Sequence, residues 1–152
     1  MPQSKVTHIK RIDWNKLDLS DEVNIAAQMI VLDIRTGIEK NKDIDGNTFA
    51  KLAPSTIKAK RAKGYPLKPL WAKGMMKEVY VKPLATRRKP QAKIQVPKGR
   101  DGVNRIPVGV IHNIGEGLPK REWYGVGKRV LKKLRKEMKM RLNKQLKIGR
   151  AR

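Results

Sequence analysis

The sequence contains no cysteine, a single phenylalanine and only 13 acidic side chains among 152 residues. Without cysteine the chain has no disulfide framework, no cysteine-ligated zinc or iron–sulfur centre and no thiol nucleophile. No stretch approaches the roughly 18 consecutive apolar residues of a membrane-spanning helix. The N-terminus also lacks the apolar segment of a secretory signal, so we expect synthesis in the cytoplasm and no membrane partner.

Large apolar side chains are scarce as well. Leu, Ile, Val and Phe together account for 37 of the 152 residues. This share, about 24%, lies just above the level of about 20% below which highly charged chains tend to stay disordered. The chain can therefore bury only a small core, and we expect a protomer of this kind to depend on neighbouring subunits for part of its stability.

Positive charge is abundant and unevenly distributed. The chain has 37 Lys and Arg residues, a net charge of +24 and a pI near 10.7. Residues 1–50 carry a net charge of −1, residues 51–116 carry +13 and residues 117–152 carry +12. The excess begins only after the first third of the chain, and it favours an anionic partner or an assembly that compensates the charge.

Three segments have the pattern of helices. Residues 20–41 repeat apolar side chains at steps of three and four, with Ser20 as a candidate N-cap and acidic residues in the first turn. Residues 54–63 begin with proline, are followed by glycine and are mostly basic. Residues 126–147 combine an apolar stripe with lysine and arginine, and we expect Gly149 to end this helix.

Three further segments have the alternation or β-branched content of strands. These are residues 76–84, residues 92–96 and residues 106–114, the last with a bend near Gly109, and residues 97–105 read as a hairpin or loop. The predicted class is α+β: a small, mostly antiparallel sheet packed with a long helix in the N-terminal half and a long basic C-terminal helix.

The chain divides into three predicted parts. Residues 1–19 are mixed and polar, and we interpret them as an N-terminal arm or edge strand. Residues 20–147 hold all the other predicted elements and form a single α+β domain. Residues 148–152 are a short basic tail.

Two stretches resemble ligand motifs but lack their key residues. A calcium loop starting at Asp43 needs a bidentate glutamate at position 12, where the chain has Pro54, so a turn stabilised by Asx side chains is favoured. Residues 125–128 end like a phosphate-binding loop. The positions that require glycine and a hydroxyl in that loop hold Glu122 and Arg129.

The two histidines, His8 and His112, provide no metal site, and no nucleophile motif is present. A lone histidine in an apolar run is more often a hydrogen-bonded structural residue than a base or ligand. The sequence therefore predicts no catalytic residue, no metal and no cofactor.

A basic chain of this kind neutralises phosphates and releases counterions, so we expect salt-dependent binding to nucleic acid. Stacking of Trp123 and Tyr124 on bases is one alternative, and packing before the final helix is the favoured one. The candidate residues facing DNA or an acidic partner are Lys58, Lys60, Arg61, Arg87, Arg88, Lys89, Lys128, Arg129, Lys132, Lys133, Arg135, Lys136, Lys139 and Arg141.

Four spaced motifs together resemble the virion-morphogenesis family of tailed phages and Mu-like prophages. The first is an Asp-Gly pair followed by an aromatic residue, a leucine and a threonine leading into a basic helix. The second is a Pro-Leu pair followed by Gly-Met, the third is Ile-His-Asn-Ile-Gly, and the fourth is Pro-Lys-Arg-Glu-Trp-Tyr-Gly before the last helix. They occupy residues 45–56, 69–75, 111–115 and 119–125.

The resemblance implies a structural virion protein without catalysis. Members of the family form or cap rings at the neck, as tail-completion, tail-terminator or head–tail joining proteins. It implies a homo-oligomeric ring, with six copies as one arrangement, that contacts neighbouring neck, adaptor, portal or tail-tube proteins and makes non-specific contact with packaged DNA. The residues expected to act as core and inter-subunit anchors are Phe49, Leu52, Trp71, Ile111, His112, Trp123 and Tyr124.

Two questions stay open from the sequence. The basic surface can face DNA in the lumen of a ring or an acidic surface of a neighbouring ring. The alternative function is a stand-alone basic nucleic-acid-binding protein, such as a ribosome- or nucleoid-associated factor.

Overall fold

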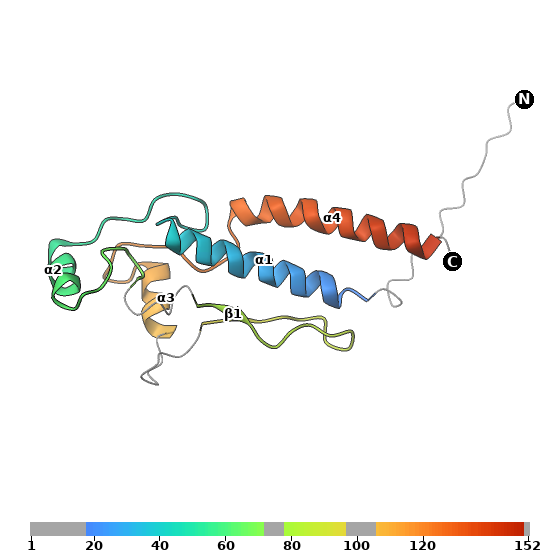
Figure 1. The fold of residues 1–152 in the computed structure, drawn as a ribbon, viewed down its shortest axis with the longest axis horizontal. Coiled ribbons are helices and arrows are strands. Elements are labelled where there is room, and N and C mark those ends of the chain that lie inside the picture. Colours follow the sequence, from blue (N-terminus) through green and yellow to red (C-terminus); the bar gives the residue numbers. More distant parts are fainter. Residues whose placement is uncertain (1–17, 72–77, 97–105, 151–152) are drawn as a thin grey trace, which may run out of the picture.

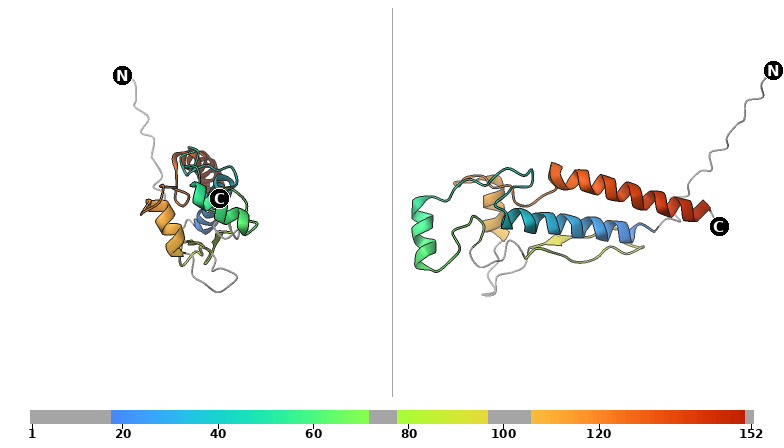
Figure 2. Two further views of the ribbon diagram at one scale, coloured as in Figure 1. Left: turned by 90° about the vertical axis from the view of Figure 1, so that its left-hand side faces the viewer. Right: turned by 45° about the horizontal axis from the view of Figure 1, so that its top comes forward.

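The computed structural model describes residues 18–71, 78–96 and 106–150, with the backbone alone for residues 106–108 and 147–150. The described chain is elongated (Figure 1 and Figure 2). Two long helices, α1 (Ser20–Glu39) and α4 (Lys128–Arg150), lie side by side and antiparallel. The short helices α2 (Pro54–Ala62) and α3 (Ile106–Ile114) lie toward the end of the molecule where α1 ends.

The predicted α+β class is confirmed, although the sheet is very small. Strands β1 (Tyr80–Val81) and β2 (Ile94–Gln95) pair antiparallel, with Tyr80 opposite Gln95 and Val81 opposite Ile94. The sheet lies on the opposite side of α1 from α4 (Figure 1). Both predicted strands are found in the right place but are shorter than predicted. Pro83 follows β1 closely and has no N–H to donate to a continuing ladder.

Helix α1 confirms the helix predicted for residues 20–41 but not its predicted cap. Ser20 is the first helical residue, so the N-cap position is held by Leu19, whose side chain makes no capping hydrogen bond. The Ser20 N–H instead donates to Asp18 Oδ1 at 3.0 Å. A carboxylate two residues upstream replaces the hydroxyl, because it accepts the N–H and places a negative charge at the positive end of the helix.

Helix α2 confirms the prediction for residues 54–63. Pro54 begins the helix, and Gly64, just after its end, has a φ of +63°. Such a left-handed residue is the common way to close a helix, and glycine adopts it without a steric penalty.

Helix α3 overturns the predicted strand at residues 106–114 and the bend near Gly109. Its β-branched residues favour a strand only as an average preference, which tertiary contacts override. Pro107 fits the first turn of a helix, and Gly115, with a φ of +81°, closes it through a 2.8 Å bond from its N–H to the Ile111 carbonyl. The loop predicted for residues 97–105 lies outside the described residues.

Helix α4 begins two residues later than predicted and continues through Gly149, so the predicted end at that glycine is wrong. Glycine weakens a helix by about 1 kcal/mol relative to alanine, which lowers stability but does not by itself stop the helix. Residues 148–150 of the predicted tail are therefore helical. Most of the predicted arm, residues 1–17, lies outside the described residues.

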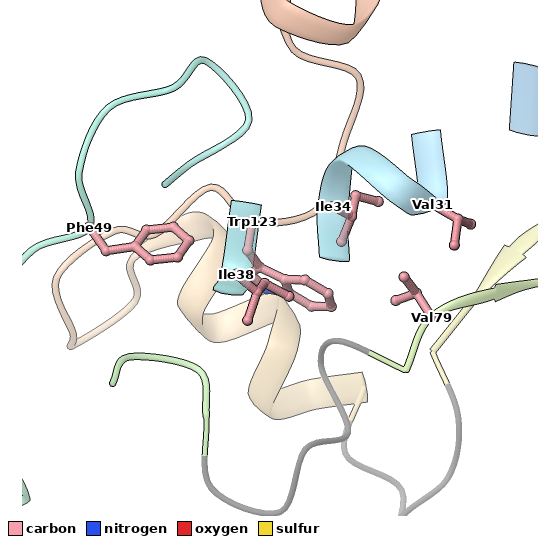
Figure 3. Close-up of a cluster of buried hydrophobic side chains, with 6 residues drawn as sticks. All are labelled: Val31, Ile34, Ile38, Phe49, Val79 and Trp123. Carbon is pink, nitrogen blue, oxygen red and sulfur yellow. The ribbon is translucent and has the colours of Figure 1, made fainter. Parts of the chain in front are cut away.

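The core is small, as predicted, with ten buried hydrophobic residues in the part of the chain that the structure describes. Its central cluster joins α1 to the loop after it, to the residue before β1 and to the segment before α4 (Figure 3). The cluster consists of Val31, Ile34, Ile38, Phe49, Val79 and Trp123.

Two polar contacts fix α4 on α1. Arg129 donates to both carboxylate oxygens of Asp33, from Nε to Oδ1 at 2.8 Å and from Nη2 to Oδ2 at 3.0 Å. Near the other end, Gln145 Nε2 donates to Glu22 Oε1 at 2.7 Å.

Among the described helices, none has the length and apolar character that crossing a bilayer requires.

Candidate assembly and anion-binding surfaces

Three of the four motifs come together in one cluster, which we call the motif cluster: residues 44–52, 109–115 and 119–127. The Ile44 N–H donates to the Glu122 carbonyl at 2.8 Å, and the Arg121 N–H donates to the His112 carbonyl at 2.7 Å. The Tyr124 N–H donates to Asn113 Oδ1 at 3.0 Å. Motif segments that are far apart in the sequence are therefore joined by their backbones.

The Asp-Gly turn of the first motif has a structural role. Asp43 Oδ1 accepts the N–H groups of Asp45 and Asn47 at 3.0 and 2.7 Å, which confirms the predicted Asx-stabilised turn. Asp45 Oδ1 in turn accepts the Lys128 N–H at 3.0 Å, and so caps α4 from a distant part of the chain. Within the described residues, no group of three His, Asp or Glu side chains is placed to hold a metal ion.

Gly127 is required by close packing. A Cβ at this position would lie 1.9 Å from the Ile44 carbonyl oxygen, far inside contact distance. This explains the glycine that resembled part of a phosphate-binding loop: the backbones of residues 44 and 127 touch, and no side chain fits between them.

Arg121 is the central side chain of the motif cluster. The sequence placed it in the fourth motif, although it was not named among the individual anchor residues. It is only 4% exposed. Its guanidinium donates to the carbonyls of Ala50 at 3.2 Å, Lys51 at 3.4 Å and Pro119 at 3.3 Å. Burial lowers the pKa of Arg121, and its partners are carbonyl dipoles rather than a carboxylate. A guanidinium has five N–H donors, which suits it to tie several carbonyls at once.

His112, a predicted anchor, is half-buried and lies 3.4 Å from the Arg121 guanidinium through its Nδ1. Burial lowers the pKa of His112, and the nearby positive charges of Arg121 and Lys60 lower it further. The ring is therefore neutral at pH 7.

Lys60, on α2, was predicted to face a partner. Its side chain instead points into the loop that follows α2. Its Nζ donates to the carbonyls of Pro66 at 3.1 Å, Lys68 at 2.7 Å and Trp71 at 2.6 Å. Desolvation, followed by the charge of Arg121, lowers the pKa of Lys60. The ring of the half-buried Trp71, another predicted anchor, has the Lys68 Nζ 5.0 Å from its centroid.

Both aromatic residues of the fourth motif are engaged internally. Trp123 is 3% exposed, and its Nε1–H donates to the Gly109 carbonyl at 2.9 Å. Tyr124 meets Trp123 edge to face with centroids 5.4 Å apart, and its hydroxyl donates to the Ile94 carbonyl at 2.8 Å. Together the two rings tie α3, β2 and the segment before α4 to one another.

The other predicted anchors lie in or beside the same cluster. Phe49 is buried in the core, whereas Leu52 and Ile111 are half-buried. The sequence therefore identified side chains that pack, but it did not assign an individual role to Arg121, the arginine that holds their loops together.

An open apolar depression of about 330 Å³ borders the motif cluster. Val110 and Ile114, on the outer side of α3, are 49% and 57% exposed at its rim. In the part of the chain that the structure describes, four of the nine exposed large hydrophobic residues lie in or directly beside the motif segments, and they are Val110, Ile114, Leu118 and Val126. The residues that line the depression are Ile94, Gln95, Val96, Gly109, Val110, Asn113, Ile114, Trp123 and Tyr124.

The outer side of α4 forms a second surface, which is cationic. Arg129 and Arg141 are paired with Asp33 and Glu137. Five other basic residues are exposed on one side of the helix, and we call them the α4 stripe. They are Lys128, Lys132, Arg135, Lys136 and Lys139.

The remaining predicted partner-facing cations are scattered over other elements. Lys133 is exposed on α4 outside the stripe, and Lys58 and Arg61 are exposed on α2. The turn of the β1–β2 hairpin exposes three consecutive cations, Arg87, Arg88 and Lys89.

We compared the chain with known proteins. No family model, no curated protein and no solved structure matches it.

Proposed function

We propose that the protein is a structural component of a tailed-phage virion, in which copies of the chain form a ring at the neck and complete or join the tail without catalysis. The observation that carries the proposal is the use of the motif residues. Arg121 and Trp123 donate to backbone carbonyls of the motif cluster, and Asp45 accepts the backbone N–H of Lys128, directly after the cluster. The residues on which the family resemblance rests therefore build a scaffold, and this use of them supports a structural role.

The apolar surface beside this scaffold supports self-association. Soluble proteins seldom expose neighbouring large hydrophobic side chains without a binding role. Val110 and Ile114 line the same depression as Trp123 and Tyr124, whose side chains are fixed by hydrogen bonds. In the proposed ring, a second copy of the chain covers this surface, and burial of α3 adds to the small core of each protomer.

The proposed location determines the partners. A ring at the head–tail interface contacts adaptor, portal or tail-tube proteins on its two faces and surrounds the path of the packaged DNA. Each copy brings 24 net positive charges, so closing a ring places like charges near one another. An anion in or beside the ring offsets this repulsion.

The proposal is tested on the full chain and on the virion. Purified protein is imaged by electron microscopy and its mass measured by sedimentation, with the expected result of a closed ring. Deletion of the gene is expected to give particles with heads and tails that fail to join stably. A monomer at all concentrations, together with normal virions from the deletion strain, overturns the proposal.

The α4 stripe supports a second candidate function, a stand-alone basic nucleic-acid-binding protein. The two candidates differ in where the protein resides. Mass spectrometry of purified virions finds the chain at a fixed copy number if it is a neck protein. Recovery only with ribosomes or the nucleoid supports the second candidate.

A further inference from the structure

We infer that the α4 stripe binds the phosphate backbone of duplex DNA without reading its sequence. The inference rests on the proposed function only for the source of the DNA, which is the packaged genome. The binding itself depends on the arrangement of charges on α4.

The stripe is a continuous line of cations. Its five members fall within a sector of about 100° around the helix axis, on the side away from the buried Val130 and Leu134. From Lys128 to Lys139 the line extends about 17 Å at the usual rise per residue. One strand of duplex DNA has a phosphate for about every 3.4 Å of axis, so a line of this length faces on the order of five phosphates.

The stripe is left without counter-charges inside the described part of the protein. No described ion pair joins any of its members to a carboxylate, whereas Arg129 and Arg141 on the same helix are both paired. The first turn of α4 also contains no acidic residue. Like charges three and four residues apart repel, and cations oppose the positive end of the helix dipole. An external anion removes both sources of repulsion.

The composition of the stripe favours DNA over an acidic protein. Protein interfaces are depleted in lysine and are built around aromatic or apolar anchors. Between Lys128 and Lys139 no apolar or aromatic residue falls in the sector of the stripe. The lack of aromatic residues also disfavours single strands, whose bases stack on such side chains. Lysine on a flexible stem suits phosphates at variable positions, which matches binding without sequence selection.

The test measures binding of the full chain to a labelled mixed-sequence duplex over a range of salt concentrations. With five phosphate contacts, the logarithm of the binding constant should fall against the logarithm of salt with a slope of about −4.5. The triple variant K132Q/K136Q/K139Q should flatten this slope by about 2.7. Glutamine and lysine have similar helix propensity, so α4 should persist, which far-UV circular dichroism checks.

A matched control removes the same charge elsewhere. The variant K58Q/R61Q/K63Q changes two exposed cations on α2 and a third, Lys63, directly after its end. The slope of this variant should stay within about 0.5 of the wild-type slope, which corresponds to about half a phosphate contact. A further variant, K132R/K136R/K139R, retains the charge and should retain the wild-type slope.

Each alternative outcome overturns the inference. Equal flattening in the α2 control means that charge acts diffusely rather than through α4. An unchanged slope in the α4 triple variant means that the stripe does not contact phosphate. Tighter binding to a single strand of equal length excludes the duplex, and binding to polyglutamate but not to the duplex assigns the stripe to an acidic protein.

Ring formation by the same variants separates the two proposals. If the chain is monomeric at all concentrations and the deletion strain makes normal virions, but the slope depends on the α4 stripe, the neck proposal fails and the DNA inference stands. If rings form normally and the slope is insensitive to the stripe, the DNA inference fails and the neck proposal stands.

Discussion

The cations of the motif cluster and those of the α4 stripe are chemically alike but have opposite surroundings. Arg121 is buried and donates to three backbone carbonyls, and Lys60 is likewise surrounded by three. Lys132 and Lys136 are exposed on α4. The net charge therefore does not distinguish two kinds of cation. One kind organises loops within the protomer, and the other remains available to an external anion.

Burial explains why the first group is held so differently. A buried cation is costly unless polar groups replace its hydration. The backbone carbonyls of the loops around the motif cluster provide that replacement. These carbonyls need hydrogen-bond donors, because a loop without regular secondary structure does not pair them with backbone N–H groups. Arg35 on α1 is exposed, and its Nε and Nη2 also donate to a backbone carbonyl, that of Val79, at 3.1 and 2.6 Å.

The largest expected effect is on the scaffold. Trp123→Ala should lower the free energy of unfolding by about 3–5 kcal/mol, because it empties the core beside Ile38 and removes the bond to Gly109. Urea unfolding followed by circular dichroism measures the change. Lys139→Ala, on the stripe, should change stability by less than about 0.5 kcal/mol. Similar losses in both variants would contradict the assignment of the two regions.

A smaller loss is expected for Arg121→Met. Methionine keeps much of the volume but leaves the carbonyls of Ala50 and Pro119 without their donor, which should cost about 2 kcal/mol. The unfolding midpoint in urea reports the loss, and Lys132→Met is the matched control with an expected change near zero. Equal stability of the two variants means that Arg121 does not hold the loops.

The apolar rim should affect assembly rather than folding. The double variant V110E/I114E places charge on two exposed residues of α3, so monomer stability should change little. Self-association should weaken more than about tenfold, which corresponds to about 1.4 kcal/mol. Sedimentation over a range of concentrations measures this. Leu84→Glu, at an exposed hairpin residue, is the control, and wild-type association in V110E/I114E counts against this rim as the interface.

The smallest effect concerns pH. The pKa of His112 is lowered by burial and by the charges of Arg121 and Lys60. The unfolded chain therefore takes up a proton first as the pH falls below the ordinary histidine value of 6.5, and stability present above that pH is lost. Thermal unfolding between about pH 7.5 and about pH 5 should show a smaller decrease in His112→Gln than in wild type. An identical decrease in both would assign the pH dependence to other groups.

The predictable parts of the fold were those with long periodic patterns. Helix α1 and the basic helix α4 were found because apolar side chains recur through several turns. Helix α3 was missed because nine residues rich in valine and isoleucine have no decisive period. Pro107 at its start and Gly115 after its end were the available signals for a helix.

Only some residues of the motif cluster were predicted correctly, because the sequence reports local patterns and not tertiary contacts. Aromatic residues at a motif indicate packing, so Trp123 and Tyr124 were expected to act as anchors. Arg121 was part of the fourth motif but was not named as an anchor, because nothing local distinguishes a buried arginine from an exposed one. Lys60 and Arg129 were expected to face a partner. The carbonyls that Lys60 contacts belong to the loop directly after α2, whereas the carboxylate that Arg129 contacts, that of Asp33, comes from a segment distant in the sequence.

The sequence by itself determined the class of the fold, the two long helices, the small core and the surplus of positive charge. These properties follow from composition and from local periodicity, which the chain carries wherever it folds. Only the tertiary structure decided which cations are internal ties and which form a line on α4. That division depends on which carbonyls and carboxylates come within hydrogen-bonding distance of each cation, and such contacts join residues as far apart as Asp33 and Arg129.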